Sequence, residues 1–391
     1  MKILIVAMTD SVHTARWVSQ ISDTGWDIHI FPGILGGIIH PELKDVIVHD
    51  DFLVFDGKVR IKKSSFFKIF LAIPDLIWTL GNKRKFHLRR LEKLIKGIKP
   101  DVVHSLDFQK AGYLVLEAAK SNPRRKYKWI ATNWGSDIYL FGRLPEHRKK
   151  IMEVLKSCDY YSCECNRDIK IGQEFGFSKT VLPVLPNSGG FDLEKVKKLR
   201  QKGKTSGRRL IVLKGYQGWA GRALVGLRAL ERCVDLLKGY ELAIYSIQPD
   251  TGVDFAARLF SEKYGIKIHL IPLHTLHNEI LKLHGRARIS IGLSISDAIS
   301  TLVLEAMAMG SFPVQSNTSC ANEWFKSGRG GFLVPPEDPE IIEKAIRRAL
   351  KDDKLVDEAA KINWQVVKDR LDAKELKKKM AAFYEQAMSG D

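Results

Sequence analysis

The chain alternates between short apolar runs of strand length and longer amphipathic segments of helix length. Residues 2–7 form an apolar run after Lys2, and a helical pattern over 12–24 follows it. Further runs of strand length cover 27–31, 99–104 and 128–132. Because buried parallel strands read as continuous apolar runs, this alternation predicts a parallel β-sheet covered by helices.

The same alternation begins again after a turn-rich cluster at 185–190 and a basic polar stretch at 195–209. Strands are predicted at 209–213, 241–245, 267–271, 289–293 and 312–315, and helices at 222–237, 302–309 and 339–351. The pattern therefore predicts an α/β protein built from two doubly wound, Rossmann-like halves. The boundaries we expect are a first domain over 1–186, a linker over 187–208, a second domain over 209–354 and a helical tail over 355–391.

The helical tail has no strand after it, and we expect it to lie back across both domains. Open α/β sheets bind ligands at the carboxyl ends of their strands. Two facing sheets would therefore place the functional site in the cleft between them.

Composition narrows the class of protein. With 391 residues, 45% of them hydrophobic, the chain can bury a sizeable core, which excludes disorder over its whole length. Five cysteines are too few for a disulfide scaffold, and their odd number favours a reducing cytosol. No apolar run reaches the roughly 18–20 residues that a membrane span needs. We read the apolar start, 1–8, as a strand rather than a secretory signal, and expect a cytoplasmic location.

The net charge of +18 is concentrated in one segment. Residues 58–99 contain thirteen cationic residues and only two acidic residues, Asp75 and Glu92. An apolar, aromatic stretch over 64–80 precedes several of them, as in interfacial membrane contacts, so residues 64–99 are a candidate for an anionic membrane surface. The alternative is that this stretch packs on the sheet and the cations form a solvated helix face. No nucleic-acid module is recognised, so we expect no nucleic-acid partner.

Several segments can be compared with known phosphate-, dinucleotide- and metal-binding motifs, and none of them matches fully. Gly203-Lys204-Thr205 resembles the end of a P-loop, but Lys198 stands where the first glycine is required. No Gly-x-Gly-x-x-Gly follows the first strand, which argues against a nicotinamide dehydrogenase. No Asp-x-Asp pair occurs, so a transferase that binds its metal through that pair is not supported. The cluster of Cys158, Cys163 and Cys165 lacks standard zinc spacing with His147, and buried small hydrophobes are the favoured interpretation over zinc.

Residues 294–310 carry the chemistry that the pattern favours most. They begin at a strand end and enter a helix that Ser300 or Thr301 can cap. The exposed amides at such a helix start suit an anion such as a diphosphate. Glu305 lies on the same face as Thr301 inside an apolar run, so its carboxylate needs hydrogen-bond donors, and a ribose supplies two hydroxyls. The alternative is that Glu305 caps a backbone loop and Asp297 is a solvated turn residue.

This segment resembles the Glu-x7-Glu region of family 4 retaining glycosyltransferases, which have the GT-B fold of two facing Rossmann-like domains. The spacing from Asp297 to Glu305 matches, with Asp in place of the first Glu. The resemblance extends through 305–310, 312–314, Glu323 and 330–335, and it includes 186–192 as the linker. It covers most of the second domain and, more loosely, the strand layout of the first.

The resemblance implies that the second domain binds a UDP- or GDP-linked sugar as donor substrate, with no separate cofactor and no metal ligands. Glu305 would hold the nucleotide ribose and Asp297 the donor sugar. The diphosphate would meet the amides of 299–301, and the base would lie beside the loop at 273–274. The residues implied in donor binding are Glu305, Ile299, Ser300, Thr301, Leu273, His274 and Tyr216.

Arg222 and Lys214 are the basic residues that the resemblance places on the diphosphate, and Tyr216 stands where the family usually has a second Arg. In the first domain, Asp10, His13, His104 and Asp137 follow strand patterns. Trp134 stands where the family often has a catalytic His. The implied catalytic set is therefore Asp297, Arg222, Lys214, Asp137 and His13.

The function predicted on this basis is retaining, metal-independent transfer of a sugar to a hydroxyl of a glycan or a lipid-linked acceptor, in glycan, polysaccharide or glycolipid synthesis. We expect the acceptor to bind the first domain and the enzyme to be cytoplasmic or peripheral on the membrane. Two alternatives remain: a nucleotide-sugar epimerase of similar architecture, and a non-catalytic binding protein on this scaffold.

Overall fold

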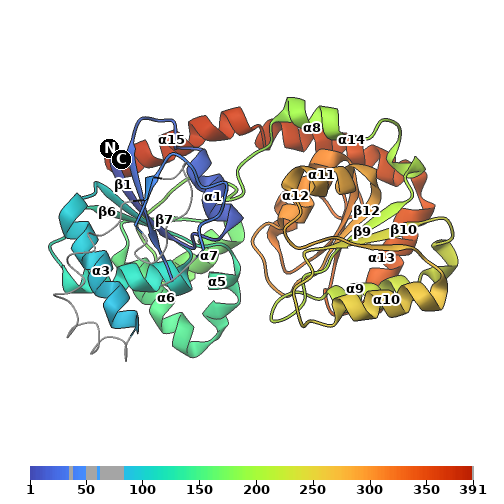
Figure 1. Cartoon of the computed structure of the whole chain (residues 1–391), viewed down its shortest axis with the longest axis horizontal. Helices are drawn as coiled ribbons and strands as arrows, with labels where there is room; N and C mark the ends of the chain where they lie inside the picture. The colour runs from blue at the N-terminus through green and yellow to red at the C-terminus, as the bar shows by residue number, and fades with distance from the viewer. Residues whose placement is uncertain (35–37, 50–59, 62–82, 390–391) are drawn as a thin grey trace. The chain divides into compact units, whose positions relative to one another are not determined.

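The computed structural model describes residues 1–34, 38–49, 60–61 and 83–389. The chain divides into two compact units. The first comprises Met1–Gly189 with Glu375–Asp391, and the second comprises Gly190–Lys374. In each unit a central sheet is surrounded by helices (Figure 1).

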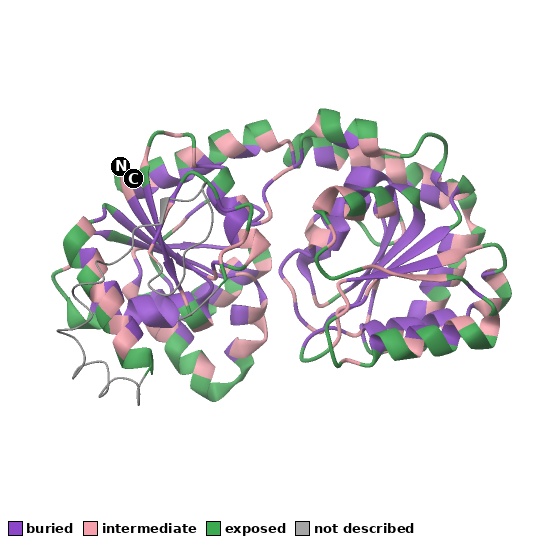
Figure 2. Cartoon of the chain, in the orientation of Figure 1, coloured by how far each residue is buried: buried purple, intermediate pink, exposed green. Residues whose placement is uncertain are grey.

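The first unit contains a parallel sheet whose described strands follow the order β4-β3-β2-β1-β5-β6-β7-β8. Their bounds are β1 (Lys2–Ala7), β2 (Asp27–Pro32), β3 (Ile47–Val48), β4 (Arg60–Ile61), β5 (Val102–Leu106), β6 (Lys128–Thr132), β7 (Tyr160–Ser162) and β8 (Thr180–Val181). Five of the six residues of β1 are buried, as expected for a central strand covered on both faces (Figure 2).

The helices described in the first unit connect these strands or cover the sheet. They are α1 (Val12–Ser19), α3 (Lys83–Ile98), the π-helical turn η3 (Phe108–Gly112), α4 (Tyr113–Ser121), α5 (Ser136–Tyr139), η4 (Phe141–Arg143), α6 (Pro145–Ser157), α7 (Asn166–Glu174) and α15 (Ala373–Ser389). Helix α15 belongs to this unit from Glu375 onward, although it is the last helix of the chain. Its Phe383 and Tyr384 are buried.

The second unit, all of whose residues are described, has a six-stranded parallel sheet in the order β11-β10-β9-β12-β13-β14. The strands are β9 (Leu210–Lys214), β10 (Glu241–Tyr245), β11 (Ile268–Leu270), β12 (Ala287–Gly292), β13 (Phe312–Ser316) and β14 (Phe332–Val334). The order steps outward from β9 in both directions, which is the doubly wound arrangement.

The helices and 3-10 turns of the second unit lie between and beyond these strands. They are α8 (Leu193–Leu199), η5 (Thr205–Gly207), α9 (Ala223–Glu231), η6 (Val234–Leu236), α10 (Val253–Tyr264), α11 (His277–Arg286), α12 (Thr301–Met309), η7 (Cys320–Glu323), α13 (Pro339–Lys351) and α14 (Asp353–Arg370). Eight of the nine residues of α12 are buried, so this helix is apolar nearly all round.

The predicted parallel α/β architecture is confirmed in both units. Strands β1, β6 and β10 and helix α13 have the predicted bounds. Two predicted helices are shorter. Helix α1 ends at Ser19 rather than 24, and α9 ends at Glu231, with the separate turn η6 replacing its last part. The short strands β3, β4, β7, β8 and β14 were not predicted, because runs of two or three residues carry little periodicity.

The segment predicted as a linker, 187–208, is largely part of the second unit. It contains α8 and η5, and Asp192 caps α8 by accepting hydrogen bonds from the amides of Glu194 and Lys195. The predicted tail divides between the units: α14 belongs to the second, and 375–391 to the first.

Of the basic segment, the stretch 62–82 lies outside the described residues, and α3 carries the cations that follow it. No helix among the described residues is both long and apolar enough to cross a membrane. Cys158, Cys163 and Cys165 are buried, and the first two are free thiols. Burial raises the pKa of the Cys158 thiol to about 12, so it stays protonated and apolar in character.

Candidate functional site

The loop between β12 and α12 forms the start of the candidate site. Ser300 holds the N-cap position with φ −66° and ψ 127°, as predicted, but its side chain makes no capping hydrogen bond. The amide of Cys320 donates to the carbonyl of Ala298 at 2.6 Å, which fixes the loop just before the helix. The first amides of a helix have no acceptor within it, so those at the start of α12 are the donors that this loop offers to an anion.

A second loop, between β9 and α9, is joined to the first loop by backbone hydrogen bonds. The amide of Arg222 donates to the carbonyl of Leu293 at 3.0 Å, and that of Ile295 donates to Ala220 at 2.8 Å. Gly221 allows the tight turn within the β9–α9 loop, because a Cβ there would lie 2.1 Å from the carbonyl oxygen of Tyr216 in the same loop. The two loops therefore form one continuous rim at the carboxyl ends of β9 and β12.

Glu305 lies on α12 behind this rim and is only 5% exposed. Its Oε1 is 2.9 Å from Nε2 of His277, and its Oε2 is 3.5 Å from Nε2 of His284. Burial alone would raise the pKa of Glu305, but the two histidines outweigh it and hold the pKa well below the usual range. The carboxylate is therefore charged at neutral pH although it is buried.

The histidine pair is the part of the site that sequence reasoning missed. His284 is fully buried, and its Nδ1 lies 2.8 Å from the hydroxyl of Ser290 on β12, which orients the ring. His277 and His284 lie seven positions apart, which is two helical turns and hence one face of α11. That spacing was the only signal in the sequence. It does not show that Glu305 is the partner, because this depends on the packing of α11 beside α12.

Asp297 is half-buried in the β12–α12 loop. Burial raises the pKa of Tyr216, and the negative charge of Asp297 raises it further, so these two side chains interact. Lys214 ends β9 and is half-buried. The structure thus gathers Asp297, Tyr216 and Lys214 at the same strand ends.

Arg222 occupies the N-cap position of α9, and its guanidinium is largely committed to protein partners. Its Nε donates to Glu337 at 2.9 Å, and its Nη1 donates to the carbonyls of Gly218 and Gly221. The side chain is 19% exposed. A diphosphate at this place would share Arg222 with Glu337.

The residues predicted to lie near the nucleotide base, Leu273 and His274, are exposed in the loop between β11 and α11. Ile299 and Ser300 are buried, and Thr301 is half-buried at the helix start.

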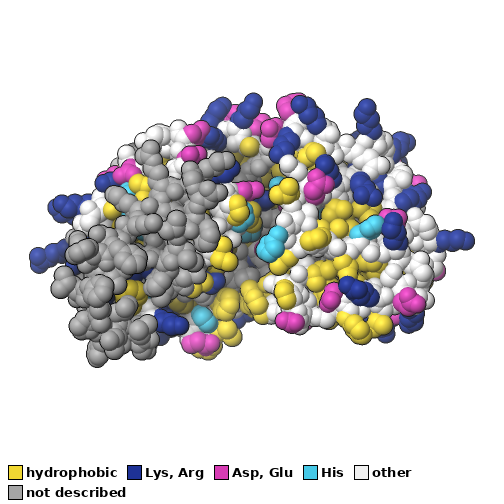
Figure 3. All heavy atoms as spheres, viewed as in Figure 1, with side chains coloured by type: hydrophobic (Ala, Val, Ile, Leu, Met, Phe, Trp, Pro, Cys, Tyr) yellow, Lys and Arg dark blue, Asp and Glu magenta, His cyan; other side chains and the backbone are white. Residues whose placement is uncertain are grey.

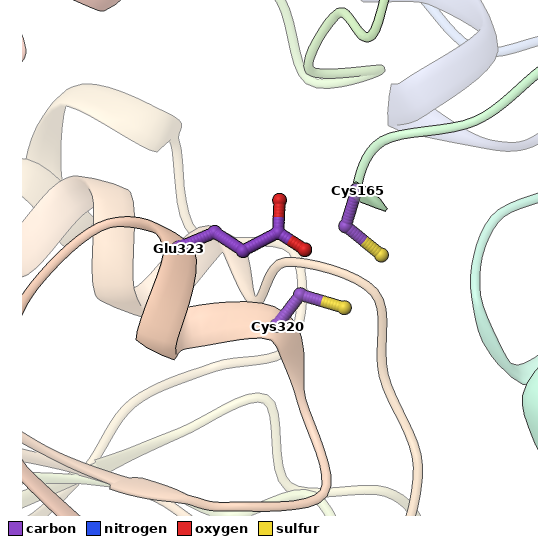
Figure 4. A group of neighbouring side chains, drawn as sticks. All are labelled: Cys165, Cys320 and Glu323. Atoms are coloured by element: carbon purple, nitrogen blue, oxygen red, sulfur yellow. The ribbon is translucent and has the colours of Figure 1, made fainter. Parts of the chain in front are cut away.

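The short turn η7 follows β13 and carries Cys320 and Glu323. Figure 4 shows these two side chains together with Cys165, which precedes α7 in the first unit.

The candidates in the first unit lie on α1, on the loop after β6 and on α5. The rings of His13 and Trp134 are 5.7 Å apart, so the residue that replaces the family's usual His is beside another histidine. Asp137 is buried and accepts hydrogen bonds from the amides of Trp134 and Phe108. Burial raises the pKa of Asp137 well above its usual range, and the nearby Asp107 adds to this. In this position Asp137 organises the loop that carries Trp134.

Models of two known families match most of the chain. A model of the family described as Glycosyl transferase 4-like matches residues 2–160, and one described as Glycosyl transferases group 1 matches residues 252–364, which include Asp297, Glu305 and both histidines. The chain belongs to the group 1 glycosyltransferases. This identifies the chain as an enzyme that transfers glycosyl groups from nucleotide sugars.

The glycosyltransferase is also similar to solved structures over its whole length. Sucrose-phosphate synthase from Thermosynechococcus elongatus shares 13% identity, with all of both chains covered and a TM-score of 0.68. HepE from Anabaena, in complex with UDP-glucose, shares 12% identity, with 99% of this chain and 100% of that chain covered and a TM-score of 0.70. A glycosyltransferase from Rickettsia africae shares 15%, with coverage of 100% and 99% and a TM-score of 0.67. No curated protein sequence matches significantly.

These neighbours have the GT-B fold, so the predicted fold class is confirmed.

Proposed function

We propose that this glycosyltransferase uses a UDP- or GDP-linked sugar and transfers the sugar to a hydroxyl with retention of anomeric configuration, without a catalytic metal. The observation that carries the proposal is Glu305, a buried and charged carboxylate one turn after the start of α12 at Thr301. The complexes of HepE with UDP-glucose and with UDP support a UDP-linked donor.

The ribose would bind at Glu305. A carboxylate has about four acceptor positions. His277 occupies one on Oε1, and His284 lies 3.5 Å from Oε2 without a hydrogen bond. The remaining positions are enough for the two hydroxyls of a ribose. The histidines keep the carboxylate charged, and hydrogen bonds to a charged acceptor are the stronger ones.

The diphosphate would bind at the start of α12. The amides of 299–301 and the positive end of the helix, together with Arg222 and Lys214, would stabilise the negative charge that develops as the nucleoside diphosphate departs. Asp297 would contact the donor sugar. We propose that these groups stabilise the diphosphate without a divalent cation.

The acceptor would bind the first unit, where His13 and Trp134 lie side by side. We propose a glycan or lipid-linked acceptor in polysaccharide or glycolipid synthesis. A peripheral contact with an anionic membrane through 64–99 would suit such an acceptor. In the described part of this segment, α3 exposes Lys83, Lys93 and Lys96. Elsewhere Lys and Arg side chains are interspersed with carboxylates, as on the visible face of the second unit (Figure 3).

The donor site is tested by titrating UDP, GDP, UDP-glucose and GDP-mannose by calorimetry into the wild type and Glu305→Gln. We expect at least a tenfold loss of affinity, or about 1.4 kcal/mol, in the variant. Glu279→Gln is the matched control, because Glu279 is exposed on α11 and paired with Lys282. Equal affinity in Glu305→Gln and the wild type would contradict the assignment.

Stereochemistry and metal dependence have separate readouts. The anomeric proton coupling of the product, recorded by NMR before mutarotation, should show the configuration of the donor. The turnover should persist in excess EDTA. Conversion of the donor sugar into its epimer without transfer would instead identify an epimerase, and no reaction with any donor would support a binding protein.

Membrane contact is tested by co-sedimentation with phosphatidylglycerol and phosphatidylcholine vesicles. We expect binding to the anionic vesicles alone, weakened by the triple change Lys83→Glu, Lys93→Glu and Lys96→Glu. The matched control reverses three exposed lysines of the second unit, Lys195, Lys198 and Lys202. Equal loss in both triple variants would show that only total charge matters and would contradict a contact through α3.

A further inference from the structure

A cavity of about 680 Å³ lies within the second unit, between the segment 200–208 and helix α14. Its volume is in the range of small-molecule sites. None of the candidate donor-binding residues lines it, so it is separate from the site described above. The lining residues that matter here are Arg200, Lys204, Arg208, Lys354, Lys361 and Trp364.

Arg208 is the most unusual of these, because its charged side chain is only 4% exposed. Its Nη1 donates to the carbonyls of Ala287 and Met309, at 3.1 and 3.2 Å. Its Nε is buried and makes no hydrogen bond to any described residue. Burial, with the nearby Arg200 adding to it, lowers the pKa of Arg208 to about 10, so the group is still charged at neutral pH. An unpaired buried donor of this kind costs free energy until a partner arrives.

Arg200 lies close to Arg208, beside Gly310. Its guanidinium lies 4.7 Å from the ring centre of Trp364, stacked as a cation on an aromatic face. A Cβ built on Gly310 would be 2.6 Å from Nη2 of Arg200 and 3.4 Å from Nη2 of Arg208. Two guanidinium groups thus approach one position beside the end of α12, and like charges at such range repel unless an anion lies between or beside them.

Two of the three carboxylates that line the cavity have other partners, although the charge of Asp357 also acts on Arg208. Asp357 accepts hydrogen bonds from the amide and hydroxyl of Ser206, both at 2.9 Å. Asp353 lies 2.7 Å from Nη2 of Arg288. The third, Glu358, is exposed. Five cationic residues therefore face three carboxylates, two of which have other partners, and the lining keeps an excess of positive charge.

We propose that this cavity binds the phosphate group of a small phosphorylated ligand, with Arg200 and Arg208 as the phosphate-binding pair and Trp364 as the wall beside them. Arginine suits this role because its planar fork of donors matches phosphate oxygens. The lysines at 204, 354 and 361 are exposed around the opening and would attract the anion.

The position of the cavity gives the ligand a route to the donor site, and this step rests on the proposed function. Arg208 holds carbonyls at the start of β12 and at the end of α12. The loop of the candidate donor site connects the end of β12 to the start of α12, and Glu305 lies in the middle of α12. A ligand that orders Arg208 would therefore restrain both elements and raise the affinity for the donor nucleotide.

The test is calorimetric titration of the full chain with inorganic phosphate and with glucose 6-phosphate, at constant ionic strength in chloride. We expect saturable binding of at least one probe, weakened tenfold or more by Arg200→Gln. Lys202→Gln is the control, because Lys202 is exposed nearby but does not line the cavity. Binding of phosphate alone would identify a free-ion site, and stronger binding of the ester would identify a sugar phosphate or similar metabolite.

Arg208→Gln gives a second measurement, and its folding is checked first by circular dichroism. If Arg208→Gln does not fold, Arg200→Gln alone decides. Absence of saturable binding of both probes, or equal binding in Arg200→Gln and the wild type, would overturn the proposal. Repeating the titration in Glu305→Gln separates the two sites, because phosphate binding at this cavity should survive there even if nucleotide binding is lost.

Discussion

The imidazole of His104 and the hydroxyl of Tyr384 lie 2.8 Å apart and are both buried, although 280 positions separate them in the chain. Nε1 of Trp17 donates to the same hydroxyl at 2.9 Å, and Nε2 of His104 lies 2.6 Å from the hydroxyl of Thr132. The hydroxyl can thus accept from the indole and donate to the imidazole. This chain of hydrogen bonds attaches the last helix, α15, to β5, β6 and α1 of the first unit.

Replacing Tyr384 by Phe should destabilise the first unit. The change removes one hydroxyl and leaves the indole of Trp17 and the imidazole of His104 buried without that partner. Since an unsatisfied buried donor costs about 1–3 kcal/mol, we expect a loss of that size in the free energy of unfolding. Urea denaturation measures it, with Tyr240→Phe in the second unit as the control. Equal stability of the two variants would show that the network contributes little.

The pH dependence of stability should carry the signature of His104. Burial lowers its pKa to about 3, whereas an unfolded histidine titrates near 6.5. Between these values the unfolded chain binds a proton that the folded chain does not. Stability should therefore fall as the pH drops below about 6.5, by at most about 1.4 kcal/mol per pH unit from this residue.

The variant His104→Gln isolates this contribution. Burial also raises the pKa of Asp107 to about 6, and that group acts in the opposite direction, because the folded chain then binds more protons than the unfolded one. Both proteins contain Asp107, so the difference between wild type and His104→Gln reports the histidine alone. Thermal unfolding from pH 7 to pH 4 should show a shallower decline in the variant, and parallel declines would refute the assignment.

Removing His277 should weaken donor binding rather than the chemical step. His277→Ala takes away the hydrogen bond that holds Oε1 of Glu305 at 2.9 Å. We expect the KM for the donor to rise about threefold to tenfold, or roughly 0.7–1.4 kcal/mol, with a smaller change in kcat. His277→Gln retains a donor group and should restore part of the affinity. A lower KM in His277→Ala would mean that the histidine competes with the ribose.

Gly221→Ala should disrupt the rim of the donor site. The new Cβ would lie 2.1 Å from the carbonyl oxygen of Tyr216, which is backbone and cannot rotate away. We expect loss of UDP binding and a lower melting temperature. Gly207→Ala is the control, because a Cβ there meets no atom within 4 Å, and its effect should be neutral or slightly stabilising. Retained UDP binding in Gly221→Ala would show that the loops separate without consequence.

The longer central strands of both sheets were predictable, because apolar runs such as 2–7 and 241–245 are buried on both faces. The ends of the helices were harder to predict from the sequence. Helix α1 stops at Ser19, and the turns after it are set by local hydrogen bonds, such as those that Val18 accepts from Ile21 and Ser22, rather than by a Gly or Pro signal. Glu305 and Asp297 were chosen as candidate site residues through their spacing. Their partners were not, because a buried carboxylate shows that donors are needed without showing which ones.

By itself, then, the sequence determined the alternation of strands and helices and the division into two α/β halves, and it predicted the segment 294–310 as the candidate donor site. Periodicity and spacing are local properties, and they suffice for these. Only the tertiary structure decided that His277 and His284 hold Glu305 charged, that Glu337 shares Arg222, that Tyr384 completes the first unit, and that Arg200 and Arg208 meet beside Gly310. Each of these depends on segments distant in the chain, whose contacts arise from packing.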